Sequence, residues 1–362
     1  MQKIFVTIIL SVTVLLSGCS PSHQPTERGS DTHEKPVKAP PAAVVENPWK
    51  EGMFQKGVQI YLHADKAGDA FIRERIRQNL DYVVKLGANS VGVSFPIYTD
   101  GATPTRVYVG PATPGRGLLK NAILEAKKRQ LRVLLRPILD ESNIVSEEPL
   151  AWRGSIRPEN NARWFQSYGA LLSTYAALAA QLEVEEFVAG TELVSLQSQK
   201  SEWRTLKTRI RAAGFDGKLS YAANWDSYAD LSFEPGIDAY PKIHLSDRAT
   251  VPQLTQALYQ WLTQLPVTAR GRLTIQEAGI AAQSGMYPKP YVWNSKAPVN
   301  ETVQARWFQA MYQAAKKAQV NGLYYWALDV YQDPEQELIN GTRPFSFVRK
   351  NTEAVIRSNF AD

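Results

Sequence analysis

Cysteine is almost absent from this 362-residue chain, in which Cys19 is the single example. One cysteine excludes a disulfide framework within the chain and a zinc site built from cysteines. The chain also lacks a dense basic run, because its formal charge of +6 comes from 41 Lys and Arg dispersed among 35 Asp and Glu. Proteins that bind nucleic acids usually gather basic residues on one face, so we predict no nucleic acid partner.

The motifs of several enzyme classes are missing as well. There is no HExxH, and only His63 and His244 lie outside the amino-terminal segment, so a histidine-rich metal site is not expected. The absence of GxSxG argues against a serine hydrolase of the α/β type. Without a Walker sequence or a strand-linked GxGxxG, nothing predicts a nucleotide. Carboxylate chemistry remains, which needs neither a metal nor an organic cofactor.

Aromatic residues are plentiful by contrast, with nine Trp and sixteen Tyr. Their flat, partly polar rings suit either a protein core or contact with sugar rings. The hydrophobic fraction of 44% is that of an ordinary globular protein and excludes disorder of the whole chain.

The amino terminus has the pattern of a secretory signal. Lys3 precedes an apolar stretch over residues 4–16, which is too short to span a bilayer, and Leu16-Ser17-Gly18-Cys19 follows at once. These four residues resemble the lipobox of bacterial lipoproteins, which implies lipidation of Cys19 and a membrane partner through that lipid. Ser20 after the cysteine favours the outer membrane in a Gram-negative source. A plain signal peptide with an incidental cysteine is the alternative.

Composition divides the chain into three parts. Residues 1–18 read as the signal peptide. Residues 19–48 are rich in Pro, Ser, Thr, Glu, Lys and Ala, and contain too little apolar surface to fold, so we predict a disordered tether. Residues 49–362 form the folded domain. The expected location is therefore the bacterial cell envelope, with the domain on the periplasmic or extracellular side.

The folded part alternates short β-branched or apolar runs with longer stretches of helical period. The expected strands are residues 57–62, 89–95, 131–137, 185–190, 218–223, 236–240, 272–277 and 322–328. The expected helices between them include residues 71–87, 121–130, 162–182, 201–214, 251–265 and 303–319.

Eight such units predict an α/β fold of the (β/α)8 TIM barrel type. A doubly wound open sheet is the alternative, because strand order cannot be read from one sequence. Two long connections, residues 96–116 and 138–158, follow the second and third expected strands. In a barrel both lie at the carboxyl-terminal rim, where the chemistry of this fold takes place.

Two glutamates stand at the carboxyl ends of expected strands. Glu192 follows the fourth strand and Glu277 closes the seventh. Retaining glycoside hydrolysis needs one carboxyl as acid/base and a second as nucleophile, about 5 to 5.5 Å apart. Opposite strands of a barrel can supply this geometry, although a glutamate at a strand end can also be a simple ion-pair partner at the rim.

The order of short motifs along the chain resembles glycoside hydrolase family 113, within the large clan of retaining (β/α)8 glycosidases. The motifs are WRGSI at 152–156, GTEL at 190–193, SYAANW at 220–225, DAY at 238–240, QEAGI at 276–280 and YYWAL at 324–328. The resemblance implies hydrolysis of β-1,4-mannans through a glycosyl-enzyme intermediate, with Glu192 as acid/base and Glu277 as nucleophile.

The same resemblance implies a set of substrate-binding residues. Aromatic faces stack on sugar rings, Arg153 can donate to hydroxyls, and a tyrosine near Glu277 would hold that carboxylate in place. The set comprises Trp152, Arg153, Asn224, Trp225, Tyr240 and Trp326.

Two positions depart from the clan pattern. Thr191 stands where most families place an asparagine that bonds the sugar 2-hydroxyl. Arg136-Pro137-Ile138 stands where a Lys-Pro-His is expected, so a histidine contact is lost. Both changes fall on substrate-contacting positions and leave the two glutamates in place.

We therefore predict a retaining glycosidase that cleaves a β-linked polysaccharide or oligosaccharide, acts as a monomer and is tethered to a bacterial membrane. A non-catalytic carbohydrate-binding lipoprotein on the same scaffold is one alternative. A solute-binding lipoprotein of a transporter is another, and it would have two lobes, each with an open sheet.

Overall fold

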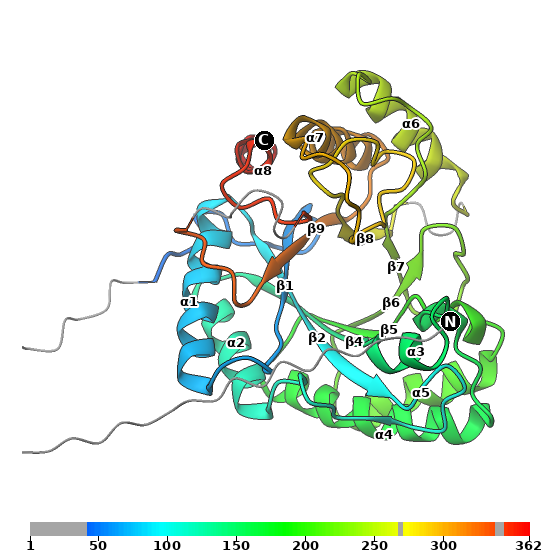
Figure 1. Ribbon diagram of the computed structural model, residues 1–362. Helices are drawn as coiled ribbons and strands as arrows, with labels where there is room; N and C mark the ends of the chain where they lie inside the picture. The colour runs from blue at the N-terminus through cyan, green and yellow to red at the C-terminus, as the bar shows by residue number, and fades with distance from the viewer. Residues whose placement is uncertain (1–41, 267–270, 337–343) are drawn as a thin grey trace, which may run out of the picture. The chain divides into compact units, whose positions relative to one another are not determined.

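The computed structural model describes residues 42–266, 271–336 and 344–362. Its centre is a ring of eight parallel strands with helices around the outside (Figure 1). The strands are β1 (Gln55–Tyr61), β2 (Ser90–Thr99), β4 (Arg132–Leu139), β5 (Glu186–Thr191), β6 (Lys218–Asn224), β7 (Glu234–Asp238), β8 (Thr274–Ala278) and β9 (Gly322–Asp329). Cys19 and the expected signal peptide lie outside the described residues.

The ring is closed by pairing of the first strand with both the second and the last. Val58 of β1 pairs with Val91 of β2 on one side and with Tyr325 of β9 on the other, in parallel register. An open sheet would leave two edge strands unpaired, so the doubly wound alternative is wrong. A two-residue strand, β3 (Val107–Tyr108), pairs antiparallel with the end of β2, outside the ring.

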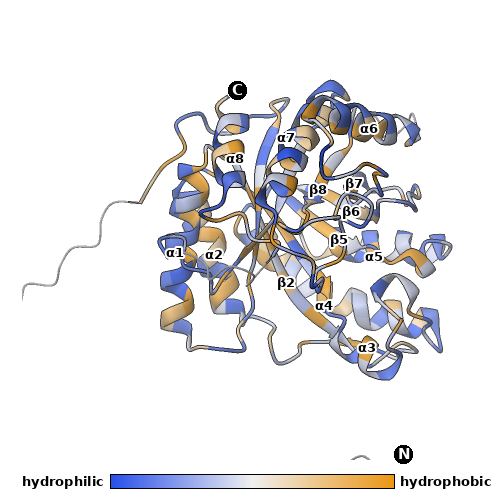
Figure 2. Cartoon of the chain, turned by 45° about the horizontal axis from the view of Figure 1, so that its top comes forward, coloured by the Kyte–Doolittle hydropathy of each residue, from blue (hydrophilic) through white to orange (hydrophobic). Residues whose placement is uncertain are grey.

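The helices cover the ring with their apolar faces inward, and Figure 2 shows hydrophobic colour concentrated on the strands and mixed colour on the helices. In α6, Leu254, Leu258 and Leu262 recur at helical spacing and are buried. The helices are α1 (Asp69–Lys85), α2 (Arg116–Lys128), α3 (Ser142–Glu147), α4 (Asn161–Gln181), α5 (Lys200–Ala212), α6 (Val251–Gln264), α7 (Glu301–Lys317) and α8 (Asn351–Ala361).

The eight expected strands and six expected helices are all present, with ends displaced by a few residues. Two helices, α3 and α8, were not anticipated. The six-residue α3 lies inside the long connection 138–158 and is too short to display a period. In addition, contact with the domain begins before the expected boundary at residue 49, because the backbone N–H of Val45 donates to the Arg129 carbonyl at 3.0 Å.

The interior of the barrel is filled in part by a polar network below the carboxyl-terminal rim. The amide of Gln276 donates to Glu186 at 2.7 Å, and Glu186 is paired with Arg132 at 2.5 Å. Gln59 crosses the barrel to donate to the Gln276 carbonyl at 2.6 Å. All four side chains are buried, so the network joins β1, β4, β5 and β8 and gives the rim above it a rigid base.

This filled interior predicts a strong effect at Gly57, where a Cβ atom would overlap the ring of buried Tyr324. Tyr324 cannot turn away, since its hydroxyl donates to Gln55 at 2.8 Å and accepts from Arg132 at 2.9 Å. We expect Gly57→Ala to lower the free energy of unfolding by about 1–3 kcal/mol, measured by urea denaturation. Gly117→Ala on α2, where the nearest atom lies 3.4 Å away, is the matched control and should be neutral or stabilising. Equal stability of the two variants would contradict the prediction.

Candidate active site

The two glutamates stand at the carboxyl-terminal rim of the barrel, as the sequence predicted. Glu277 lies in β8, and Glu192 directly follows β5. Each is only 7% exposed. Burial of two carboxyl groups at one end of a barrel is unfavourable unless both are paired or one is protonated, so the neighbours of each glutamate decide what this site does.

The backbone of Glu192 departs from the strand that precedes it. Its φ is +55°, in the left-handed region that residues other than glycine adopt at a cost of roughly 1–3 kcal/mol. Hydrogen bonds on both sides hold it there: its N–H donates to the Ala222 carbonyl of β6, and its carbonyl accepts from Val194, both at 2.8 Å. This turn ends the regular alternation of side chains along β5 at the residue that carries the carboxyl group.

Arg153 binds the Glu192 carboxyl group directly. Its Nη1 lies 2.8 Å from Glu192 Oε2, its Nη2 lies 3.3 Å from Glu141, and its Nε donates to the Leu139 carbonyl at 3.0 Å. The sequence predicted a contact with sugar hydroxyls for Arg153. In the structure all three of its nitrogens have protein partners, so it holds the first glutamate in place.

Burial and neighbouring charges set the protonation of Glu192. Burial is the largest cause and raises its pKa, the charge of Arg153 opposes the rise, and the charge of Glu277 adds to it, which together bring the pKa to about 7. A carboxyl group with this pKa is protonated in mildly acidic solution and can act as a general acid.

Glu277 is bound by a different arginine. Arg136, on β4 and 0% exposed, places Nη2 3.0 Å from Glu277 Oε2 and 2.5 Å from Asp238 Oδ2. Its Nε donates to Thr191 at 3.3 Å. The sequence identified Arg136 only as a departure from a family pattern and did not single out Asp238. The sequence held two signals: Asp238 ends β7 within the DAY motif, and Arg136 lies on β4 in the place of an expected lysine.

The remaining expected site residues on β6 and β7 lie at the same rim. Asn224 ends β6 and donates to Asp226 at 2.6 Å, and Trp225 follows it with the Lys242 ammonium 5.5 Å from its ring. Tyr240 is buried just beyond β7. Burial raises the pKa of Tyr240 well above its usual value and the charge of Glu277 raises it further, which keeps this phenol protonated near the glutamate.

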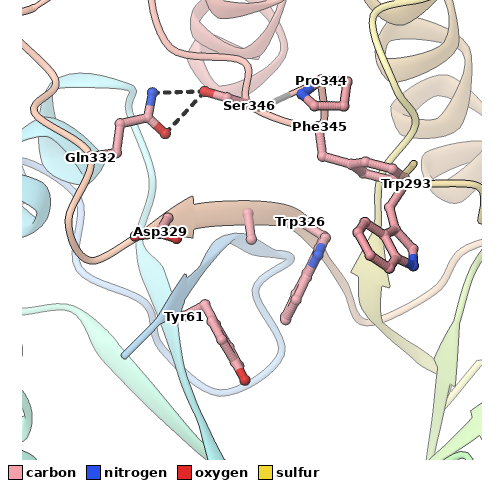
Figure 3. A pocket seen from close by; sticks show the side chains of 9 residues that line it. Tyr61, Trp293, Trp326, Asp329, Gln332, Pro344, Phe345 and Ser346 are labelled. Carbon is pink, nitrogen blue, oxygen red and sulfur yellow. Dashed lines mark hydrogen bonds between the residues drawn. The ribbon is translucent and has the colours of Figure 1, made fainter. Parts of the chain in front are cut away.

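Trp326 lies on β9, which is the neighbour of β8 in the ring. Its ring is 5.9 Å from that of Tyr61, and the Arg136 guanidinium lies 5.8 Å from its centre. Trp326 lines a pocket in which the rings of Tyr61 and Trp326 lie across from Gln332 and Ser346, which are hydrogen-bonded to each other (Figure 3). The lining residues are Tyr61, Trp293, Trp326, Ala327, Asp329, Gln332, Pro344, Phe345 and Ser346.

Trp152 lies near Glu192 because the chain at Gly154 passes close to the backbone of Glu192. A Cβ atom at Gly154 would overlap the Trp152 ring and would lie 2.8 Å from the Glu192 carbonyl oxygen. Only glycine therefore fits between this half-buried indole ring and the backbone of Glu192. The structure thus brings Trp152, Arg153 and Glu192 together, as the sequence predicted.

Comparison with known families agrees with this geometry. The model of Glycoside Hydrolase Family 113 matches residues 61–346, which is most of the chain and includes every site residue discussed above. The chain belongs to glycoside hydrolase family 113. It is accordingly a glycoside hydrolase. The solute-binding alternative is wrong, because the chain belongs to this family and has a closed barrel in place of two lobes with open sheets.

Solved structures show the same fold for this family 113 chain. A GH113 β-1,4-mannanase is 22% identical with a TM-score of 0.71, over 86% of this chain and 99% of that one. The GH113 β-mannanase AaManA from Alicyclobacillus acidocaldarius is 20% identical with a TM-score of 0.67, over 86% and 98%. A GH5_18 structure from Streptomyces cattleya is 13% identical with a TM-score of 0.54, over 85% and 80%. No significant match was found among curated proteins.

Proposed function

We propose that this family 113 chain hydrolyses β-1,4-mannan or its oligosaccharides with retention of anomeric configuration. The observation that carries the proposal is the pair of buried glutamates at the ends of β5 and β8, each held by its own arginine. The mannan substrate is taken from the β-mannanases that the chain resembles in fold.

In the first step Glu192 donates its proton to the glycosidic oxygen while Glu277 attacks the anomeric carbon. The bond to the leaving sugar breaks, and a glycosyl ester on Glu277 forms. In the second step Glu192 removes a proton from water, the water oxygen bonds to the anomeric carbon, and the ester bond breaks. Atoms and charges balance over the two steps, and no cofactor takes part.

The change in the role of Glu192 from acid to base follows from the charges in the site. The Glu277 carboxylate is one of the causes that raise the pKa of Glu192. Glu277 loses its charge when it becomes an ester, so this cause disappears and the pKa of Glu192 falls. Arg153 remains 2.8 Å away and stabilises the resulting carboxylate. The acid of the first step is thereby converted to the base of the second.

The aromatic residues supply the sugar-binding surfaces of the proposal. Trp326 and Trp152 are half-buried at the rim and stack against pyranose faces, while Trp225 and Asn224 line the side next to β5. Because the leaving group lies toward the acid, we assign the Trp225 side to the leaving sugar.

Reducing-sugar release from a panel of mannans, glucans, xylans and bacterial exopolysaccharides tests the proposal, with Glu277→Gln beside the wild type. Release from β-1,4-mannan alone, lost in the variant, supports it, and proton NMR of the first product reports the anomeric configuration. Release from another glycan would refute the substrate. Binding without release by either protein would favour a carbohydrate-binding lipoprotein.

We also propose that lipid on Cys19 anchors the enzyme to the bacterial envelope and that the enzyme acts as a monomer. Cys19 lies in the part of the chain that the structure leaves undescribed, and none of the described helices is long and apolar enough to cross a membrane. Labelled palmitate should enter the wild type and not Cys19→Ala, and light scattering should give the mass of one chain.

A further inference from the structure

Arg136 serves two carboxyl groups with one nitrogen. Its Nη2 bonds both Asp238 and Glu277, at 2.5 Å and 3.0 Å, whereas Nη1 is buried and has no hydrogen-bond partner among the described residues. Oδ1 of Asp238 is likewise buried without a partner there. An arginine and an aspartate normally use two parallel hydrogen bonds. Here a single nitrogen of Arg136 bonds Asp238, and the same nitrogen also bonds Glu277.

Burial makes this sharing energetically important. The side chains of Arg136 and Asp238 are 0% exposed, so water does not screen the interaction between them. Burial raises the pKa of Asp238 well above its usual value, the charge of Arg136 opposes this rise, and the charge of Glu277 adds to it. Asp238 is therefore most readily ionised when Glu277 carries no charge. Removing one partner of such a buried pair leaves an uncompensated charge, which is strongly destabilising. During the proposed reaction Glu277 itself loses its charge, and Arg136 would then be left without compensation if Asp238 were absent.

We propose that Arg136 and Asp238 act as a positioning pair for Glu277, in which Arg136 favours the ionised nucleophile and Asp238 compensates Arg136 when Glu277 becomes a glycosyl ester. The inference rests on the proposed function, since it takes Glu277 as the nucleophile. Arg136 bonds Oε2 of the Glu277 carboxylate, and neither Arg136 nor Asp238 exchanges a proton or a bond with the sugar. Both act through the charge and the orientation of the Glu277 carboxylate.

The other charged and titratable groups around Glu277 are few. Glu192 from the end of β5 and Tyr240 from the end of β7 interact with it electrostatically, as does Arg153 from the connection after β4. The charge of Arg136 also lowers the pKa of Glu192, so Arg136→Met should move the alkaline side of the pH profile of kcat/KM to higher pH. The acid side of that profile is therefore the part that reports on Arg136, Asp238 and Glu277.

The experiment is the pH profile of kcat/KM on β-1,4-mannohexaose. Arg136→Met removes the cation that binds the Glu277 carboxylate, so the midpoint on the acid side of the profile should move to higher pH by about 1–3 units. Arg136→Lys keeps a cation and should return this midpoint most of the way to its wild-type position. Asp238→Asn leaves Glu277 as the only carboxyl group bonded to Arg136 Nη2, so the midpoint should move in the opposite direction, to lower pH.

A merely structural role would not produce these shifts, because a smaller folded fraction lowers kcat/KM equally at every pH. Arg272→Met is the matched control, since Arg272 is exposed and 3.7 Å from Glu234, and its profile should equal that of the wild type. Two results together would overturn the inference and leave the proposed function intact. The first is an acid-side midpoint of kcat/KM that equals the wild-type value in both Arg136→Met and Asp238→Asn. The second is an inactive Glu277→Gln.

Retained activity in Glu277→Gln would instead refute the proposed function. If the wild type does not cleave mannohexaose, a titration of 13C-labelled glutamate carboxyl groups, with Glu277 assigned from Glu277→Gln, measures the same shifts without substrate. Opposite shifts for Arg136→Met and Asp238→Asn support the pair, and identical titrations overturn it.

Discussion

Replacing Glu277 by glutamine should lower kcat/KM on the cleaved glycan by on the order of 10⁴-fold or more, because the amide cannot form the glycosyl ester. The fold should survive, since glutamine has the same shape and can still accept a hydrogen bond from Arg136, which lies 3.0 Å from Glu277. Thermal unfolding beside steady-state kinetics separates the two effects.

A second variant identifies the role of Glu277 as nucleophile. Glu277→Ala leaves room for azide, which should restore turnover of an activated β-glycoside and give the α-glycosyl azide, the product of a single inversion. The control is Glu234→Gln, at the start of β7 and in an exposed ion pair with Arg272, and it should keep wild-type rates. Wild-type activity in Glu277→Gln, or a β-azide, would contradict the assignment.

Replacing Glu192 by glutamine should lower kcat/KM on natural glycans by about 10²–10⁴-fold, the usual contribution of a general acid. The loss should depend on the leaving group. A dinitrophenyl glycoside needs no proton, so its first step should stay fast and the glycosyl-enzyme should accumulate as a burst. Equal losses on the glycan and on the activated substrate would argue against the role of Glu192 as acid.

The pH dependence gives a second test of Glu192. Its raised pKa of about 7 means that the acid form is present below about pH 7 and is lost as the pH rises through that value. Wild-type kcat/KM should therefore fall on the alkaline side with a midpoint near pH 7. In Glu192→Gln this alkaline limb should be absent from the residual activity on the glycan, and a wild-type limb in that variant would assign it to another group.

The barrel could be predicted because its strands are short apolar runs and its helices carry regular apolar faces. The strand at 322–328 and the helix at 251–265 both have these patterns and are present. The helix α8 was missed because only Ile356 and Phe360 mark its inward face among polar residues. Its burial depends on the closed barrel, which no local pattern contains.

The candidate site divides in the same way. Glu192 and Glu277 could be found because each ends a recognisable strand, and strand ends meet at one rim. Arg136 could not be assigned to them, because its partners Asp238 and Glu277 lie 102 and 141 residues away in the chain. Which carboxyl group faces which guanidinium depends on the register of strands across the barrel, and a single sequence does not reveal it.

The left-handed backbone at Glu192 bears on how such an enzyme can lose its activity. Glycine adopts that conformation without the cost that glutamate incurs there, so Glu192→Gly would remove the acid and relieve the strained backbone at once. A lineage released from selection for hydrolysis would therefore find inactivation favourable to folding. A protein that binds glycans without cleaving them would thus lie one substitution away from this chain.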